Sequence, residues 1–201
     1  AVTSASEASL YFLDVGQGDS SIIVLPGAVQ ILVDGGPPNR KLLEELSEVL
    51  GTGDRYIDFL VMTHPQLDHF GGFIEALGQY EIGVFISNGR AGETDGYRAL
   101  RDALAAKQVP YVALGEGDLI RYGSSRIEFF APSPGEFLSE ELNDTSLVFR
   151  LSVGGVAALY TGDIGAAVEE RLAAEGNVTS DILKVPHHGS KTGLTREILN
   201  I

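Results

Sequence analysis

Apolar residues along this chain fall into short runs that are rich in β-branched and aromatic side chains and are separated by glycine, proline and small polar residues. Such runs are typical of β-strands. The run at 57–62 is apolar enough for a strand that is buried on both faces of its sheet. The predicted strands are 9–15, 20–25, 29–33, 57–62, 83–87, 111–114, 126–130, 146–153, 156–160 and 182–185.

Leucines at helical spacing predict an amphipathic helix over 41–50. Further helices are predicted at 97–107 and 166–174, and another begins at 73–77. The order is strands first, then alternating helix and strand, then hairpins, then helix and strand again. This order predicts a layered α/β domain with mixed sheets.

The length of 201 residues is enough for one domain with a sizeable core. We expect residues 1–8 to be a linker and residues 9–201 to form the domain. The chain has no cysteine, so any metal ion must be held by imidazole, carboxylate, amide or water. No apolar run is long enough to span a membrane, and taken alone the chain is expected to be soluble.

The formal net charge is −14, from 14 basic and 28 acidic residues. A surface of this sign repels nucleic acid at long range, which weighs against a passive DNA-binding module. It does not exclude an enzyme that meets phosphate through bound cations, because bound cations dominate the local field.

The chain holds four histidines, each predicted to lie where a strand gives way to a loop. The first two, His64 and His69, flank Asp68, so one loop can offer two imidazoles and a carboxylate to a divalent cation. An N-cap role on the following helix is the alternative for Asp68. The other two, His187 and His188, follow the last predicted strand.

The run THPQLDHFGG at 63–72 resembles the HxHxDH motif of the metallo-β-lactamase superfamily. Supporting motifs occur in the expected order: DGG at 34–36, TGD at 161–163 and VPHHGS at 185–190. Two further runs, LDVGQGD at 13–19 and NDTSLV at 143–148, resemble the C-terminal domain of the ComEC group of DNA-uptake channel proteins. The resemblance extends from about residue 9 to the end of the chain.

The resemblance implies a four-layer αββα fold with two mixed sheets, incomplete at its C-terminus. It also implies two metal sites. Asp68, His69, Asp163 and one of the paired histidines would form the first, with His187 favoured as the ligand. Asp163 would bridge to a second site that holds His64. Asp68, Asp163 and His188 are the residues expected to take part in catalysis.

The chain departs from the family pattern at Gln66, which stands where a second histidine is usual. The second site is then poorer in nitrogen and richer in oxygen, with amide oxygen available from Gln66 or Asn143. Oxygen-rich sites favour harder cations, so we expect two divalent ions, Mn²⁺ before Mg²⁺ or Zn²⁺.

Several other residues are candidates for supporting roles. Asp34 and Asp14 are expected behind the ligands, although a turn or cap is at least as good an interpretation for Asp14. Contacts with metal or substrate are expected from Asn143, Ser146, Ser190 and Lys191. Ordinary loop and strand-start chemistry is the alternative for Asn143 and Ser146, and a solvated surface position is the alternative for Lys191.

The leading hypothesis is a metal-dependent nuclease that degrades one strand of DNA during uptake. By the resemblance, it would be a soluble domain of a bacterial membrane protein on the extracytoplasmic face, with DNA and the channel of the same polypeptide as partners. Two alternatives remain open. One is a stand-alone hydrolase of a small ester, lactam or phosphodiester. The other, favoured by Gln66, is a degenerate domain that binds DNA or a partner without catalysis.

Overall fold

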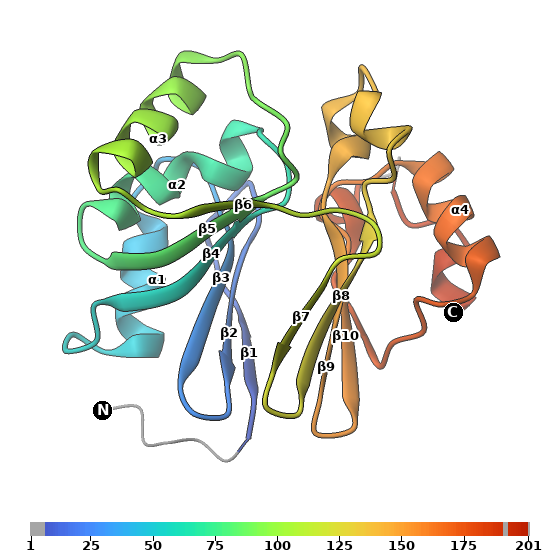
Figure 1. Ribbon diagram of the computed structural model, residues 1–201, viewed down its shortest axis with the longest axis horizontal. Helices are drawn as coiled ribbons and strands as arrows, with labels where there is room; N and C mark the ends of the chain where they lie inside the picture. Colours follow the sequence, from blue (N-terminus) through green and yellow to red (C-terminus); the bar gives the residue numbers. More distant parts are fainter. Residues whose placement is uncertain (1–6, 191–192, 201) are drawn as a thin grey trace. The chain divides into compact units, whose positions relative to one another are not determined.

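The computed structural model describes residues 7–190 and 193–200. The chain divides into two compact units, the first ending at Ala113 and the second beginning at Leu114. Each unit contains one mixed sheet with helices packed against it (Figure 1). The predicted α/β class with two mixed sheets is therefore confirmed.

The first unit is built on a six-stranded sheet in the order β1-β2-β3-β4-β5-β6. Strands β1 to β3 pair antiparallel, and β3 to β6 pair parallel. The bounds are β1 (Ser9–Phe12), β2 (Ser20–Leu25), β3 (Val29–Gly35), β4 (Tyr56–Met62), β5 (Glu81–Ser87), β6 (Tyr111–Ala113), α1 (Lys41–Leu50), α2 (Leu67–Leu77) and α3 (Asp95–Ala106).

Helices α1, α2 and α3 lie on one face of this sheet, as Figure 1 shows. Their apolar stripes enter a single core with the strands: Leu46 of α1, Phe73 of α2 and Leu100 of α3 are at most 1% exposed. Because β3, β4 and β5 run parallel, their carboxyl ends meet at one edge of the sheet. This is the edge where open α/β sheets place their functional residues.

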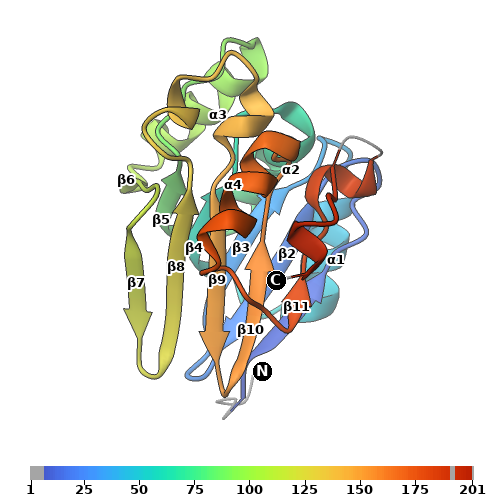
Figure 2. The same ribbon diagram turned by 90° about the vertical axis from the view of Figure 1, so that its right-hand side faces the viewer.

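The second unit is built on a five-stranded sheet in the order β11-β10-β9-β8-β7, in which only the β10–β11 pair is parallel. Helix α4 packs on it (Figure 2) through buried Val168 and Leu172. The bounds are β7 (Leu119–Tyr122), β8 (Ser125–Ala131), β9 (Val148–Val153), β10 (Val156–Tyr160), β11 (Ile182–Leu183) and α4 (Ala166–Glu175), with 3-10 helices η1 (Glu136–Leu138), η2 (Leu142–Thr145), η3 (Pro186–Gly189) and η4 (Ile198–Asn200).

One predicted helix start was wrong, and one strand was missed. The second helix begins at Leu67 rather than near residue 73, so Asp68 and His69 lie in its first turn and not in a loop. The strand β7 was not predicted, because its residues are mostly exposed and it lies at the edge of its sheet, where burial imposes no alternating pattern.

Candidate metal centre

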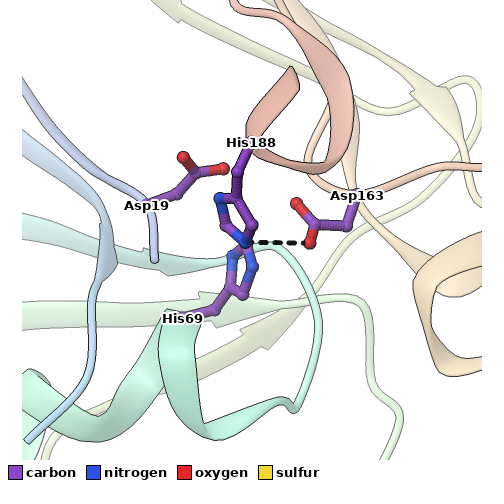
Figure 3. A group of neighbouring side chains, drawn as sticks. All are labelled: Asp19, His69, Asp163 and His188. Atoms are coloured by element: carbon purple, nitrogen blue, oxygen red, sulfur yellow. Dashed lines mark ion pairs between the residues drawn. The ribbon is translucent and has the colours of Figure 1, made fainter. Parts of the chain in front are cut away.

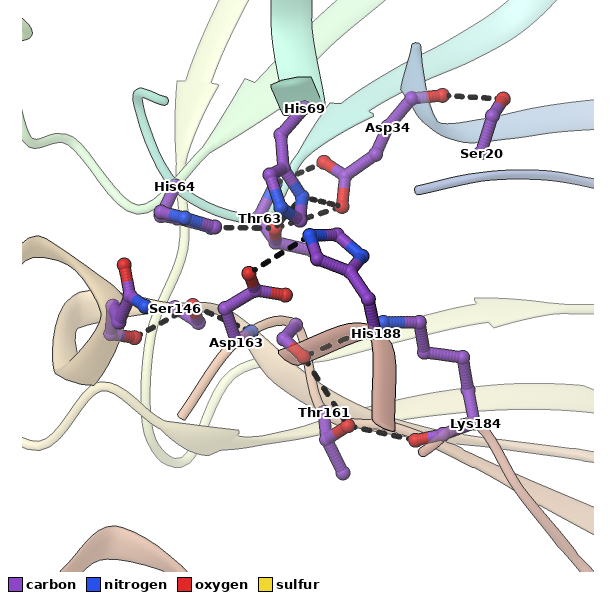
Figure 4. A network of polar contacts seen from close by, with 12 residues as sticks. Ser20, Asp34, Thr63, His64, His69, Ser146, Thr161, Asp163, Lys184 and His188 are labelled. Atoms are coloured by element: carbon purple, nitrogen blue, oxygen red, sulfur yellow. Dashed lines mark hydrogen bonds and ion pairs between the residues drawn. The ribbon is translucent and has the colours of Figure 1, made fainter. Parts of the chain in front are cut away.

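A single carboxylate, that of Asp34, organises the histidines of the first unit (Figure 4). Asp34 lies at the end of β3 and is 2% exposed. Its Oδ1 accepts the Thr63 backbone N–H at 2.8 Å, and its Oδ2 accepts the Thr63 hydroxyl at 2.8 Å. The same Oδ2 lies 2.9 Å from Nδ1 of His69. Asp34 therefore lies directly beside His69, a candidate ligand.

The hydrogen bonds of Thr63 also fix the ring of His64. The Thr63 hydroxyl donates its proton to Asp34, so the hydroxyl oxygen accepts from His64 Nδ1–H at 3.1 Å. Both imidazoles, which are fully buried, thus carry their proton on Nδ1 and leave the Nε2 lone pair as the one that can bind a metal ion. Their ring centroids are 4.2 Å apart.

Close backbone packing holds the start of α2 against the end of β3. Gly72 N–H donates to Gly36 O at 3.0 Å. A Cβ at Gly72 would lie 2.2 Å from the carbonyl oxygen of Gly35, which no side chain tolerates. The glycines of the DGG and FGG motifs are therefore what let the helix place His69 beside Asp34.

Gln66 and Asp68 shape the first turn of α2. Gln66 is the N-cap residue, and its carbonyl accepts the N–H groups of His69 and Phe70 at 3.0 and 3.1 Å. The N-cap alternative for Asp68 is therefore wrong. Asp68 sits in the first turn, where the helix dipole favours a negative charge, and its backbone oxygen accepts the Asp19 N–H at 3.3 Å.

Asp19, which was not singled out from the sequence, also lies near His69. A carboxylate oxygen of Asp19 and a ring nitrogen of His69 lie within 4.8 Å of each other (Figure 3). The available signal was the DVGQGD motif, of which Asp19 is the last residue. Asp14, the first residue of that motif, points elsewhere: it is exposed, and the hydrogen bond from Lys41 lowers its pKa.

In the second unit, Asp163 and His188 approach each other after β10 and β11. His188 Nε2 lies 3.3 Å from Asp163 Oδ2, and the carboxylate is buried (Figure 3). The TGD turn that carries Asp163 is tied to the histidine loop by backbone: Gly162 O accepts the His187 N–H at 3.2 Å. We expected His187 as the ligand, but the histidine that contacts Asp163 is His188.

The paired histidines adopt a conformation that is unusual for residues with side chains. His187 has φ 49° and His188 has φ 52°, and Gly189 continues the left-handed turn with φ 75°. This turn sends the two rings apart, with centroids 6.0 Å from each other. One ring reaches Asp163, while His187 Nδ1 lies 3.5 Å from Nδ2 of Asn143.

The NDTS segment supports the same group. Ser146 donates its hydroxyl to Asn143 O at 2.7 Å and accepts the Asp163 backbone N–H at 3.2 Å, so it links these two residues through the backbone. Ser190 donates its N–H to His187 O at 2.8 Å and closes the turn. Lys191 lies outside the described residues.

Lys184 is a second residue that sequence reasoning missed. Its Nζ donates to Gly162 O at 3.4 Å, and its own carbonyl accepts the Thr161 hydroxyl at 2.7 Å (Figure 4). Burial lowers the pKa of Lys184 to about 7. A lysine within the otherwise apolar run ILKVP was the signal.

The donors of the two units fit divalent metal ions. They are imidazole nitrogens and carboxylate oxygens, the ligands that zinc and manganese share, and the chain has no thiolate. In the first unit, the Nδ1–H groups are committed to Asp34 and Thr63, which is the arrangement that metal-binding histidines commonly show.

The chain belongs to the metallo-β-lactamase superfamily, whose family model matches residues 13–201. Within that superfamily it is similar to Competence protein ComA of Neisseria gonorrhoeae, at 30% identity over 97% of this chain and 26% of that protein. It is also similar to ComE operon protein 3 of Bacillus subtilis, at 27% identity over 97% of this chain and 27% of that protein. The chain thus spans about a quarter of these relatives.

Solved structures show the same fold. A subclass B3 metallo-β-lactamase with an active-site glutamic acid matches with a TM-score of 0.61 and 17% identity, over 92% of this chain and 79% of that chain. MEM-A1, a B3 enzyme from a soil metagenome, matches with a TM-score of 0.57 and 15% identity, over 89% and 78%. Family and donor set together support a metal-dependent hydrolase. No helix in the described part of the chain is long and apolar enough to cross a membrane.

Proposed function

We propose that this chain is a metal-dependent deoxyribonuclease domain that degrades one DNA strand during natural transformation. The observation that carries the proposal is the similarity, along 97% of the chain, to relatives named for competence. The donor set of imidazoles and carboxylates supports it, because such ligands hold divalent cations that can activate phosphate substrates.

We propose the metal ligands from the HxHxDH-like motif and from the contacts within each unit. His64, Asp68 and His69 come from the first unit, and Gln66 would add an amide oxygen. Asp163 and His188 come from the second unit. Asp163 would help to hold two divalent ions, with Mn²⁺ favoured over Mg²⁺ and Zn²⁺. This assignment exchanges the roles first expected for the paired histidines, because the 3.3 Å contact is made by His188.

In the proposed reaction, residues of the chain would orient the metal ligands and would transfer a proton to the leaving oxygen. When bound, divalent ions polarise a phosphoryl oxygen and lower the pKa of a water molecule. Asp34 and Thr63 keep the rings of the first unit in one tautomer. Ser146 holds the backbone of Asp163. His187, which is half-buried beside Asn143, is proposed to contact the phosphate and to protonate the leaving oxygen.

The net charge of −14 affects how the domain would bind DNA. An acidic surface gives no long-range attraction for phosphate, so bound cations must supply the local positive field. We propose DNA as the substrate, and the membrane channel of a longer polypeptide as the partner that delivers it. The domain would then act on the extracytoplasmic face of the membrane.

DNA cleavage with defined metals tests the proposal. The purified chain is stripped of metal and incubated with linear double-stranded and single-stranded DNA plus Mn²⁺, Mg²⁺ or Zn²⁺. We expect cleavage with Mn²⁺, and a loss of at least about 100-fold in Asp163→Asn, because a ligand carboxylate is removed. Asp102→Asn is the control, since its exposed pair with Arg101 is worth little.

The outcomes are distinct. Metal-dependent cleavage that is lost only in Asp163→Asn supports the nuclease. Hydrolysis of a small phosphodiester, ester or β-lactam without DNA cleavage would favour a stand-alone hydrolase. Metal binding without hydrolysis of any of these substrates would favour a degenerate binding domain, and would overturn the proposal.

A further inference from the structure

The turn that ends at Asp19 is tied to the candidate metal centre by its backbone. Asp19 N–H donates to Asp68 O at 3.3 Å, and Asp19 O accepts the Gly36 N–H at 2.8 Å. These two bonds join the turn to the first turn of α2 and to the end of β3. Asp19 is thus held between the two elements that carry His69 and Asp34.

Gly18 makes this close packing possible. Its φ is 150°, and a Cβ there would lie 2.3 Å from the carbonyl oxygen of Asp68 and 2.8 Å from Pro37. Only glycine lets the turn approach α2 this closely. The approach brings an oxygen of the Asp19 carboxylate within 4.8 Å of a nitrogen of His69.

The distance suits a shared cation. Carboxylate and imidazole ligands bind divalent ions at about 2.0–2.2 Å, so two ligands of one ion can lie up to about 4.4 Å apart. The upper bound of 4.8 Å on the separation of Asp19 and His69 is close to this limit. The two backbone bonds that hold Asp19 in this place use main-chain atoms of the residue.

We propose that Asp19 is a further metal ligand in the first unit, beside His69. This inference rests on the proposed metal centre. It adds a ligand from the N-terminal turn to those of the HxHxDH-like motif. An additional carboxylate ligand shifts the preference of the centre from Zn²⁺ toward Mn²⁺.

Metal titration of two matched variants tests the inference. Asp19→Asn and Asp14→Asn make the same change at the two ends of one motif. Mn²⁺ and Zn²⁺ affinities of the metal-free chain are measured by calorimetry, and bound Mn²⁺ is counted by electron paramagnetic resonance. We expect Asp19→Asn to weaken Mn²⁺ binding at least about tenfold, since even outer partners of ligands cost that much.

Asp14→Asn should bind Mn²⁺ as the unmodified chain does, because Asp14 is exposed and its carboxylate is bonded to Lys41 and to the Gly16 N–H. Asp19→Glu, which keeps the carboxylate, should retain more affinity than Asp19→Asn. Circular dichroism and thermal melting of the metal-free variants establish that each is folded. Equal Mn²⁺ affinity in folded Asp19→Asn and Asp14→Asn would overturn the inference.

Failure of this inference and failure of the proposed function give different results. If the chain cleaves DNA while Asp19→Asn binds Mn²⁺ normally, the nuclease stands and the ligand assignment is wrong. If no metal supports DNA cleavage but Asp19→Asn alone loses Mn²⁺, the ligand assignment stands and the nuclease is wrong.

Discussion

The two units carry their candidate ligands in different ways. In the first unit, His64 and His69 follow a buried strand or begin a helix, and both are fully buried against Asp34. In the second, His187 and His188 form a left-handed turn, and the backbone N–H of His187 donates to the carbonyl of Gly162. Regular elements fix the first group, whereas backbone in an unfavourable conformation carries the second. Groups of the first kind are preorganised, and strain of the second kind persists only where neighbouring structure enforces it.

The buried residues that support the histidines of the two units also differ in charge. The first anchor is a buried carboxylate that receives three hydrogen bonds. The second includes Lys184, whose burial disfavours the charged ammonium. The first arrangement should therefore stabilise the fold, and the second should cost stability at neutral and acidic pH.

The largest expected effect is that of Asp34→Ala. It leaves the Thr63 N–H, the Thr63 hydroxyl and His69 Nδ1–H without their buried acceptor. Each such loss costs about 1–3 kcal/mol, so we expect a fall of at least about 3 kcal/mol in the free energy of unfolding.

Urea denaturation of the metal-free chain measures this, with Asp144→Ala as the comparison from the second unit. Asp144 accepts one backbone N–H, that of Gly165, at 3.0 Å, so its loss should cost only about 1 kcal/mol. Equal losses in the two variants would contradict the contrast drawn between the two groups.

The next effect is the pH dependence contributed by Lys184. Its folded pKa of about 7 lies below the value of an unfolded lysine, about 10.4. Between these values the unfolded chain binds more protons, so stability rises with pH, by at most about 1.4 kcal/mol per pH unit. Below pH 7 the burial penalty is fully present.

Lys184→Met should therefore raise stability at pH 6 and flatten the rise between pH 7.5 and 8.5. Urea midpoints of the metal-free protein at several pH values measure both effects. Lys107→Met, at an exposed position, is the control and should leave the pH profile unchanged. A profile of Lys184→Met that parallels the unmodified protein would show that Lys184 does not titrate in this range.

The smallest effect concerns the strained turn. A residue with a side chain is destabilised by about 1–2 kcal/mol in the left-handed conformation. Glycine avoids this strain, but ordering its more flexible backbone costs about 0.5–1 kcal/mol of entropy. His187→Gly should therefore stabilise the fold by up to about 1 kcal/mol while DNA cleavage falls. Val185→Gly, at an ordinary φ of −61°, should instead destabilise it. Thermal melting that ranks these two variants in the opposite order would show that the turn holds no strain.

Much of the fold could be predicted where burial controls the pattern. The strands at 20–25 and 156–160 and the helix at 41–50 match to the residue, because β2 is buried throughout and α1 has a leucine stripe. The start of α2 escaped detection because Asp68, His69 and two glycines obscure its helical pattern. Those glycines are present for contact with β3, which no local pattern records.

The residues of the candidate metal centre could likewise be predicted only in part. The histidines, Asp34 and Asp163 could be found from motifs whose order along the chain is itself informative. Asp19 and Lys184 were missed although each carried a weak local signal, because their relevance depends on contacts with residues far away in the sequence. The left-handed conformation of the paired histidines was equally hidden, since only the following Gly189 signals a turn.

The shared use of Asp34 has a consequence for how the metal centre can evolve. The orientations of His64 and His69 both depend on this one carboxylate, the first through the Thr63 hydroxyl and the second directly. A mutation at Asp34 therefore alters both rings together and cannot adjust one alone. Independent adaptation to a new metal must instead arise at peripheral positions such as Gln66 and Asp19, where a changed donor leaves the common anchor intact.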